Sequence, residues 1–135
     1  MTRTSGLLDT STVILLKRVA EPAQLPDECL VSAVTLAELS VGPLVATSDD
    51  ERAARQAHLQ QAESDFEVLP FDAAAARAFA RVAASLRARG RKPSARAYDA
   101  LIAATAIAND LPLYTCNPSN FDGIDALEVF PISVD

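Results

Sequence analysis

The chain has 135 residues, of which 50% are hydrophobic and 22% are charged. These values are typical of one compact domain, so we expect residues 1–135 to form a single domain whose core needs neither disulfides nor a structural metal. Two cysteines 87 positions apart and a single histidine exclude a zinc-ligand pattern and a disulfide framework. The apolar runs are too short for a signal peptide or a membrane span, so we expect a cytoplasmic protein with no membrane partner.

The predicted elements alternate short apolar strands with helices. The strands are expected at residues 6–9, 29–31, 66–70, 113–115 and 127–130. The helices are expected at 13–18 after a cap within 10–12, from 34 to an end near Gly42 and Pro43, from Asp49, from a cap at Asp72 to Gly90, and over 96–109. This order predicts an α/β fold, with a mostly parallel sheet of about five strands and helices on both faces.

The net charge of −6 argues against a nucleic-acid partner, but the charge is unevenly distributed. Between Ala73 and Tyr98 there are seven basic residues and no acid, which leaves five basic residues against eighteen acidic ones elsewhere. Such a tract is either a solvated helix face or a surface that positions RNA phosphates. The seven candidates for RNA contact are Arg77, Arg81, Arg87, Arg89, Arg91, Lys92 and Arg96.

Three carboxylates, Asp9, Glu38 and Asp99, have apolar neighbours in the sequence, where an unpartnered charge is costly. Asp9 ends the first strand, where open α/β sheets place their ligand crevice, although it can equally cap a helix. Glu38 faces inward or outward depending on how its helix is rotated. Asp99 begins the most apolar helix and can pair with Arg96 across one turn. Together, without a catalytic histidine, cysteine or glycine-rich loop, the three acids indicate a divalent-cation site.

Four segments resemble the successive motifs of PIN-domain ribonucleases, and in particular of VapC-type toxins from bacterial toxin–antitoxin pairs. The 29 positions from Asp9 to Glu38 and the 61 from Glu38 to Asp99 fit that family. The resemblance covers nearly the whole chain, and its most specific part is the run that begins at Asp99. The four segments are Leu7 to Ser11, Ser32 to Leu39 with Gly42 after it, Tyr98 to Ala106, and Tyr114 to Phe121.

The resemblance implies a PIN-like fold over residues 1–135 and an endoribonuclease that uses Mg²⁺ or Mn²⁺. It implies that Asp9, Glu38 and Asp99 are the catalytic, metal-binding acids. It also implies a homodimer that a cognate antitoxin neutralises in a heterotetramer or larger complex, with a basic antitoxin side chain inserted into the acidic pocket. The toxin's substrate would be RNA.

The fourth motif departs from the family pattern. The family has Thr-Arg-Asp or Thr-Arg-Asn here and can add an acid before the phenylalanine, whereas this chain has Cys116 and Asn117, with Asn120 before Phe121. Asn117 offers a carbonyl oxygen to a metal but no charge. Whether one metal ion or two would bind is therefore left open.

Two other functions are compatible with the residues. An inactive PIN scaffold would bind RNA or an antitoxin without turnover, and the missing fourth acid favours it. In a phosphatase or receiver-like domain, Asp9 would be the residue that becomes phosphorylated. Such domains are expected to have an Asp-x-Asp pair here, whereas Thr10 and Ser11 follow Asp9 in this chain.

Overall fold

The computed structural model describes residues 4–135, apart from the side chain of residue 95. Its centre is a five-stranded sheet in the order β3-β2-β1-β4-β5, and every pairing between neighbours is parallel. The predicted α/β architecture is therefore confirmed. The strands are β1 (Ser5–Leu8), β2 (Glu28–Ser32), β3 (Glu67–Leu69), β4 (Leu113–Thr115) and β5 (Val129–Pro131).

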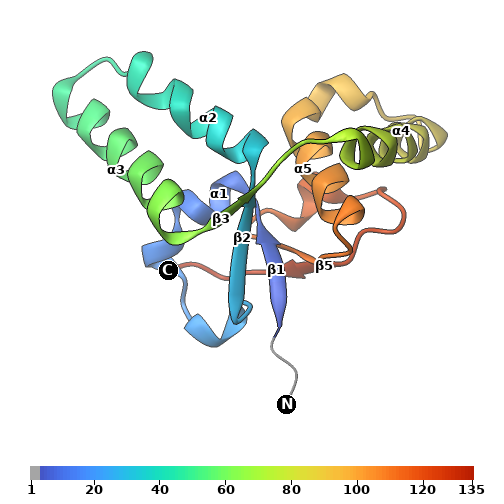
Figure 1. Ribbon diagram of the computed structural model, residues 1–135, viewed down its shortest axis with the longest axis horizontal. Helices are drawn as coiled ribbons and strands as arrows, with labels where there is room; N and C mark the ends of the chain where they lie inside the picture. The colour runs from blue at the N-terminus through green and yellow to red at the C-terminus, as the bar shows by residue number, and fades with distance from the viewer. Residues whose placement is uncertain (1–3) are drawn as a thin grey trace.

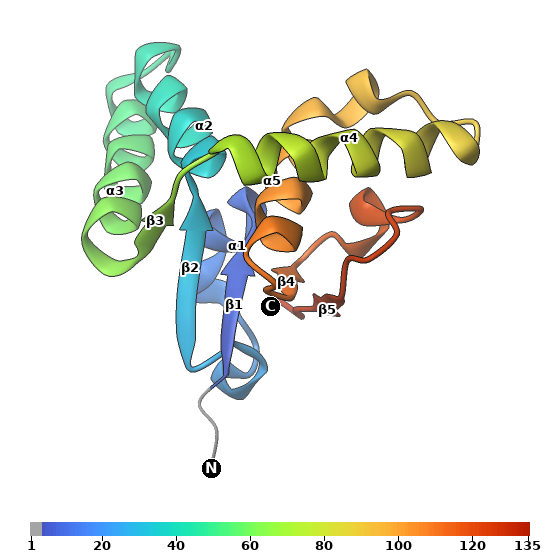
Figure 2. The same cartoon turned by 45° about the vertical axis from the view of Figure 1, so that its right-hand side comes forward.

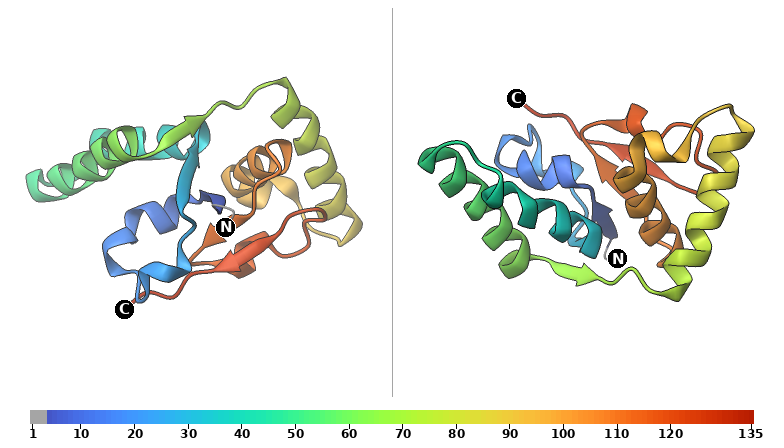
Figure 3. Two further views of the ribbon diagram at one scale, coloured as in Figure 1. Left: turned by 60° about the horizontal axis from the view of Figure 1, so that its bottom comes forward. Right: turned by 90° about the horizontal axis from the view of Figure 1, so that it is seen from above.

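Helices cover both faces of this sheet (Figures 1 and 2). Seen from above, the α2–α3 pair lies on one side of the strands and the α4–α5 pair on the other (Figure 3). The α-helices are α1 (Thr10–Ile14), α2 (Ala33–Leu44), α3 (Asp49–Asp65), α4 (Ala73–Ala88) and α5 (Ala97–Ala108). Short 3-10 helices are η1 (Leu16–Arg18), η2 (Pro22–Gln24), η3 (Pro93–Arg96) and η4 (Pro118–Phe121). None of the helices in this described part of the chain is long and apolar enough to cross a membrane.

The alternation of side chains along the strands divides the core into two layers. Leu7 lies in register with Leu30 and Leu113, and all three pack against α4 and α5. Their sequence neighbours in the same strands point to the opposite face and pack with Val13, Leu39 and Ala62 from α1, α2 and α3. Helix α5 is buried along most of its length, as its apolar sequence predicts.

The strand order places a topological switch beside β1. The chain builds outward from β1 to β2 and β3 on one side, then returns across the sheet to β4 on the other side of β1. Ligands of open α/β sheets bind at such a switch, beyond the carboxyl ends of the strands. Asp9 follows β1 directly and Thr115 is the last residue of β4, so both lie at this position.

Both predicted boundaries of the first helix are wrong, since it ends at Ile14 and the 3-10 helix η1 follows over Leu16–Arg18. The first helix begins at Thr10, three residues earlier than expected, because Asp9 itself accepts the capping hydrogen bond from the Thr12 amide. The second helix ends at Leu44, close to the end expected near Gly42 and Pro43. Pro43 lies inside the last turn of α2, and its ring is buried.

Close packing of β1 against β4 requires a residue without a side chain at position 6. A Cβ atom on Gly6 would lie 2.3 Å from the Tyr114 ring, which is itself packed against Phe130 with ring centroids 5.1 Å apart. Pro26 closes the same space at 3.1 Å. The aromatic ring therefore fixes the identity of Gly6.

We predict that Gly6→Val lowers the free energy of unfolding by roughly 1–3 kcal/mol, the usual cost of overpacking a filled core. Urea unfolding followed by circular dichroism measures this change. Gly42→Ala is the control, because its Cβ meets only the flexible Arg55 side chain at 3.2 Å and the helix gains propensity. Equal stability of the Gly6→Val variant and the wild type would contradict the packing argument.

Candidate active site

The Asp9 carboxylate is the most buried charge of the site, with 3% of the residue exposed. Its Oδ1 accepts hydrogen bonds from the Thr12 amide at 3.1 Å and the Thr12 hydroxyl at 2.6 Å. Its Oδ2 accepts from the Thr115 hydroxyl at 2.7 Å, and the Ser11 hydroxyl donates to both oxygens. Asp9 thus caps α1, which confirms the helix-cap interpretation of the sequence. Its bond to Thr115 also joins the end of β1 to the end of β4.

Glu38 projects from α2 toward the same edge of the sheet. The Thr10 hydroxyl donates to its Oε1 at 2.7 Å and lies 3.0 Å from the Thr35 hydroxyl, so α1 and α2 are linked through this acid. Burial raises the pKa of Glu38, and the negative charge of Asp9 raises it further, while the Thr10 hydrogen bond acts in the opposite direction. The helix is therefore rotated so that Glu38 is half-buried and faces the other acids.

Asp99 lies in the first turn of α5 and completes the group. Burial raises its pKa, and the charges of Asp9 and then Glu38 add to this rise. Arg96 has a smaller, opposite effect on the pKa, and no ion pair between the two side chains occurs within residues 4–135. The alternative that Asp99 is simply a helix-start acid paired with Arg96 is therefore wrong.

Glu38 and Asp99 line one open cleft of about 370 Å³ together with Ser94, Arg96, Ala97 and Tyr98. We call this the acidic cleft. Asp9 is not among its lining residues, but its charge acts on both acids. As the side chains stand, no three His, Cys, Asp or Glu residues between 4 and 135 lie close enough together to enclose a metal ion.

The two asparagines of the fourth motif make no direct hydrogen bond to the three acids. Asn117 is exposed, and its main chain bonds to the Thr115 hydroxyl and the Asn120 amide, whereas its side chain makes no hydrogen bond to any other described residue. Asn120 lines a different cavity, on the other side of Arg96. Neither residue is hydrogen-bonded to an acid of the site.

Two of the seven basic residues of the tract are engaged by the loop 122–125. Arg89 donates to the Gly123 carbonyl at 2.9 Å and pairs with Asp125 at 3.0 Å, and Arg91 donates to the Asp122 carbonyl at 3.1 Å. These two arginines therefore hold the loop 122–125 against the end of α4. The side chains that make no hydrogen bond within the described chain are Arg77, Arg81, Arg87, Lys92 and Arg96.

The sequence interpretation placed a helix cap within residues 10–12 and did not predict that hydroxyl groups orient the acids. Thr10, Ser11 and Thr12 follow Asp9 directly, and Thr115 reaches it from β4. A signal for Thr115 exists in the strand pattern, because the parallel pairing of Leu8 with Tyr114 brings the next residues of both strands together. Without that register, the sequence alone cannot connect two residues 106 positions apart.

This environment argues against phosphorylation of Asp9. A phosphoacceptor carboxylate needs one oxygen free to attack a phosphoryl group. Both Asp9 oxygens are engaged by hydroxyl or amide donors, and the residue is almost completely buried. The receiver-like alternative therefore does not fit this site.

Comparisons with known proteins agree with this architecture. Residues 7–127 match the PIN domain family. Ribonuclease VapC5 of Mycobacterium tuberculosis is 38% identical over 135 residues, covering 97% of this chain and 98% of that protein. Ribonuclease VapC1 of Rickettsia felis is 29% identical and covers 94% of this chain and 96% of its own length.

A solved structure gives the same result. The crystal structure of VapBC-5, a member of the VapBC family of toxin-antitoxin systems from Mycobacterium tuberculosis, has a chain that superposes with a TM-score of 0.83 at 39% identity. The match covers 95% of this chain and 98% of that chain. The fold, the order of the acidic motifs and these similarities together show that the chain is a PIN-domain protein and belongs with the VapC ribonucleases.

Proposed function

We propose that this chain is the endoribonuclease toxin of a toxin–antitoxin pair, and that it hydrolyses RNA phosphodiester bonds with a divalent metal ion held by Asp9, Glu38 and Asp99. The observation that carries the proposal is the convergence of these acids from the start of α1, from α2 and from the first turn of α5, with Glu38 and Asp99 lining one cleft. Asp9 follows β1, Glu38 lies on α2 and Asp99 lies on α5, so these elements bring the three carboxylates to the switch point of the sheet. There, burial and then neighbouring negative charge raise the pKa of Glu38 and the pKa of Asp99.

The donor chemistry fits Mg²⁺ or Mn²⁺. These hard cations bind oxygen ligands, hold one or two carboxylates directly and keep several waters. Glu38 has one oxygen without a hydrogen bond, and Asp99 makes none to the described residues, so both can serve as ligands. The carboxylates do not enclose an ion as they stand, which is expected for like charges that repel one another without a cation. Asn117 is a weaker candidate for an additional ligand.

The surrounding residues prepare the cleft for the reaction. The hydroxyls of Thr12 and Thr115 fix Asp9 in one orientation, and Thr10 fixes Glu38. Arg96 lines the cleft and offers its guanidinium to a phosphate. When bound, a divalent ion activates a water for attack on the phosphate and offsets the charge that develops on the phosphate oxygens. No histidine or cysteine lines the acidic cleft among the described residues, which favours water as the nucleophile.

The proposed partners are RNA, an antitoxin and a second copy of the chain. The antitoxin follows from the similarity to a chain of the VapBC-5 toxin-antitoxin system. A candidate dimer face lies at the end of α2, where Val41, Leu44 and Val45 are 53%, 85% and 59% exposed. An apolar cluster at the end of one helix is typical of an interaction site.

The alternative is a PIN scaffold that binds RNA or antitoxin without turnover. One observation favours it: asparagines occupy the positions where the family can place further acids. A cleavage assay decides between the two functions.

We predict that purified protein cleaves a pool of structured and unstructured RNA in Mg²⁺ or Mn²⁺ and not in EDTA. Asp9→Asn and Asp99→Asn are expected to reduce the cleavage rate by a factor of about 100 or more, because each removes a charge that holds the ion. The control is Asp110→Asn, an exposed acid just after the end of α5 and outside the site. RNA binding without cleavage in any metal would favour the scaffold.

We predict that Asp99→Asn raises the melting temperature of the metal-free protein at neutral pH, by roughly 1–3 °C after allowance for solvent screening. The raised pKa means that the folded state disfavours the ionised carboxylate, so the penalty exists above that pKa. It disappears when the pH falls below the pKa of the unfolded chain, where Asp99 is protonated in both states.

Calorimetry in EDTA and in Mg²⁺ tests this prediction. Millimolar Mg²⁺ should stabilise the wild type and leave the Asp99→Asn variant nearly unchanged. A variant less stable than the wild type in EDTA, or equally stabilised by Mg²⁺, would mean that Asp99 does not contribute to the cation site.

For RNA affinity, we predict that a triple substitution of Arg77, Arg81 and Arg87 by glutamine weakens binding and flattens its dependence on salt. The logarithmic slope should fall by about 0.7 for each phosphate that these arginines neutralise in the wild type. These arginines are free of intramolecular hydrogen bonds in the described structure. Arg89 and Arg91 are left intact because they hold the loop 122–125.

The control for this measurement is Arg52→Gln, which removes one exposed charge from α3. Fluorescence anisotropy with a labelled RNA across a salt series provides both the affinity and the slope. Identical slopes for the wild type and the triple variant would show that α4 does not contact the RNA backbone.

A further inference from the structure

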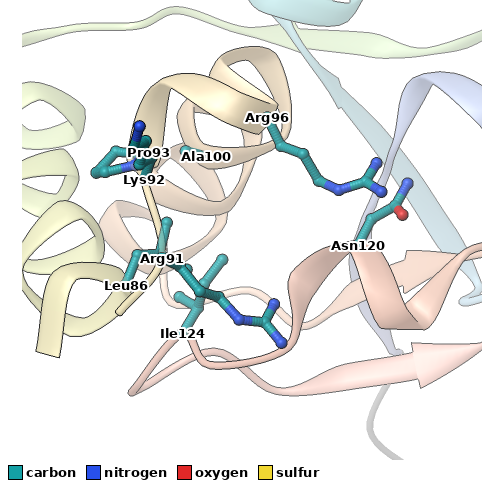
Figure 4. A pocket seen from close by; sticks show the side chains of 8 residues that line it. All are labelled: Leu86, Arg91, Lys92, Pro93, Arg96, Ala100, Asn120 and Ile124. Carbon is teal, nitrogen blue, oxygen red and sulfur yellow. The ribbon is translucent and has the colours of Figure 1, made fainter. Parts of the chain in front are cut away.

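A second cavity lies beside the acidic cleft. It has a volume of about 290 Å³ and is enclosed by the end of α4, the segment 91–96, the start of α5 and the chain after η4 (Figure 4). Leu86, Ala100 and Ile124 give it apolar walls, and Arg91, Arg96 and Asn120 bring polar groups to it. Arg96 also lines the acidic cleft, so the two spaces have this residue in common.

We propose that this cavity is a subsite for a single RNA base next to the scissile phosphate, and that Asn120 recognises the edge of that base. This inference rests on the proposed function and adds a source of sequence preference to it. We call the cavity the base subsite.

The chemistry of the walls fits a nucleotide. An RNA base has apolar faces, which pack on aliphatic side chains and on guanidinium planes, and it carries a phosphate on each side. The volume is near the lower end of the range for small-molecule sites, roughly 300–1,000 Å³, so it suits one base rather than a longer segment. Two arginines at the cavity supply the positive charge that its flanking phosphates need.

Asn120 is available to read the base. Its backbone amide donates to the Asn117 carbonyl at 3.0 Å, which fixes its position in η4. Its side-chain amide has no hydrogen bond to any described residue, and it extends toward Arg96 in Figure 4. A side-chain amide offers a donor and an acceptor side by side, and such a pair is complementary to the edge of a base.

The walls of the base subsite are held in place without a ligand. Arg91 donates to the Asp122 carbonyl, and Arg89 bonds to the Gly123 carbonyl and to Asp125, so the loop with Ile124 is attached to the end of α4. Gly123 adopts a φ of +85°, and a Cβ there would lie 2.9 Å from the Arg89 side chain. A cavity formed in advance binds its ligand without a cost for ordering the loop.

The position of Arg96 relates the base subsite to the reaction. A base in the cavity would place one of its phosphates at Arg96, on the border with the cleft that Glu38 and Asp99 line. The base subsite would therefore select which phosphodiester bond enters the acidic cleft. An acidic peptide could contact the same arginines. If the cavity served only such a peptide, RNA affinity would not depend on a base at one position.

The test measures binding in EDTA, where no cleavage is expected, by fluorescence anisotropy. The probes are 5′-fluorescein RNA hexanucleotides, one series of single sequences and one series with a single abasic ribose placed at each position in turn. We expect one abasic position to weaken binding to the wild type by about fivefold or more, which is the range for a recognised base. Other positions should have smaller effects.

The variant Asn120→Leu replaces the amide by a group of similar size. In this variant, the abasic ribose at the recognised position should weaken binding no more than an abasic ribose at any other position. Asn120→Asp is the second variant, because it keeps the shape of the residue and removes the donor. Gln60→Met, an amide replacement on the exposed face of α3, is the matched control and should behave as the wild type. Thermal melts confirm that each variant is folded.

The outcomes separate this inference from the proposed function. Two results would contradict the proposed base subsite even when Mg²⁺-dependent cleavage occurs. In the first, all abasic positions weaken binding to the wild type equally. In the second, the Asn120 variants keep the full dependence of binding on the abasic position. If position dependence is present and disappears in both Asn120 variants while no RNA is cleaved, the base subsite stands and the nuclease proposal fails.

Discussion

The structure depends on how a buried negative charge is tolerated at the switch point of the sheet. Asp9 is 3% exposed, yet each of its oxygens is satisfied by hydroxyl or amide donors from α1 and from β4. These bonds join the first strand to the fourth, and Thr10 extends the same network to Glu38 on α2. Within the described residues, no buried side-chain nitrogen or oxygen lacks a partner. Neutral dipoles thus stabilise the charge, and no ion pair within residues 4–135 neutralises it.

This arrangement supports the proposal that the site binds a divalent cation. Hydroxyl groups orient the carboxylates but leave their net charge intact, so Glu38 and Asp99 remain under stress, because burial and, to a smaller extent, neighbouring negative charge raise the pKa of each. Arg96 is the only basic residue that lines the acidic cleft in the described part of the chain, and it does not form an ion pair there. We infer that an external cation would relieve this stress, and that Arg96 is left free for phosphate.

Much of the fold and part of the site follow from the sequence. The alternation of apolar runs with helical segments predicts the parallel sheet, and caps at Asp72 and Gly90 mark α4 correctly. The predicted start of α1 is wrong, because Asp9 serves as the cap of this helix. The three acids are identifiable from their apolar neighbours. The Thr115 bond to Asp9 and the division of the basic tract by the loop 122–125 depend on long-range register, which no local pattern contains.

Mn²⁺ binding tests most directly whether the three acids form a cation site. Titration of the metal-free protein with Mn²⁺, followed by electron paramagnetic resonance of the free ion, counts the bound ions in the wild type and in a Glu38→Gln, Asp99→Asn double variant. The account predicts at least one bound Mn²⁺ per chain in the wild type and none at the same concentration in the double variant. Equal binding by both proteins would contradict it.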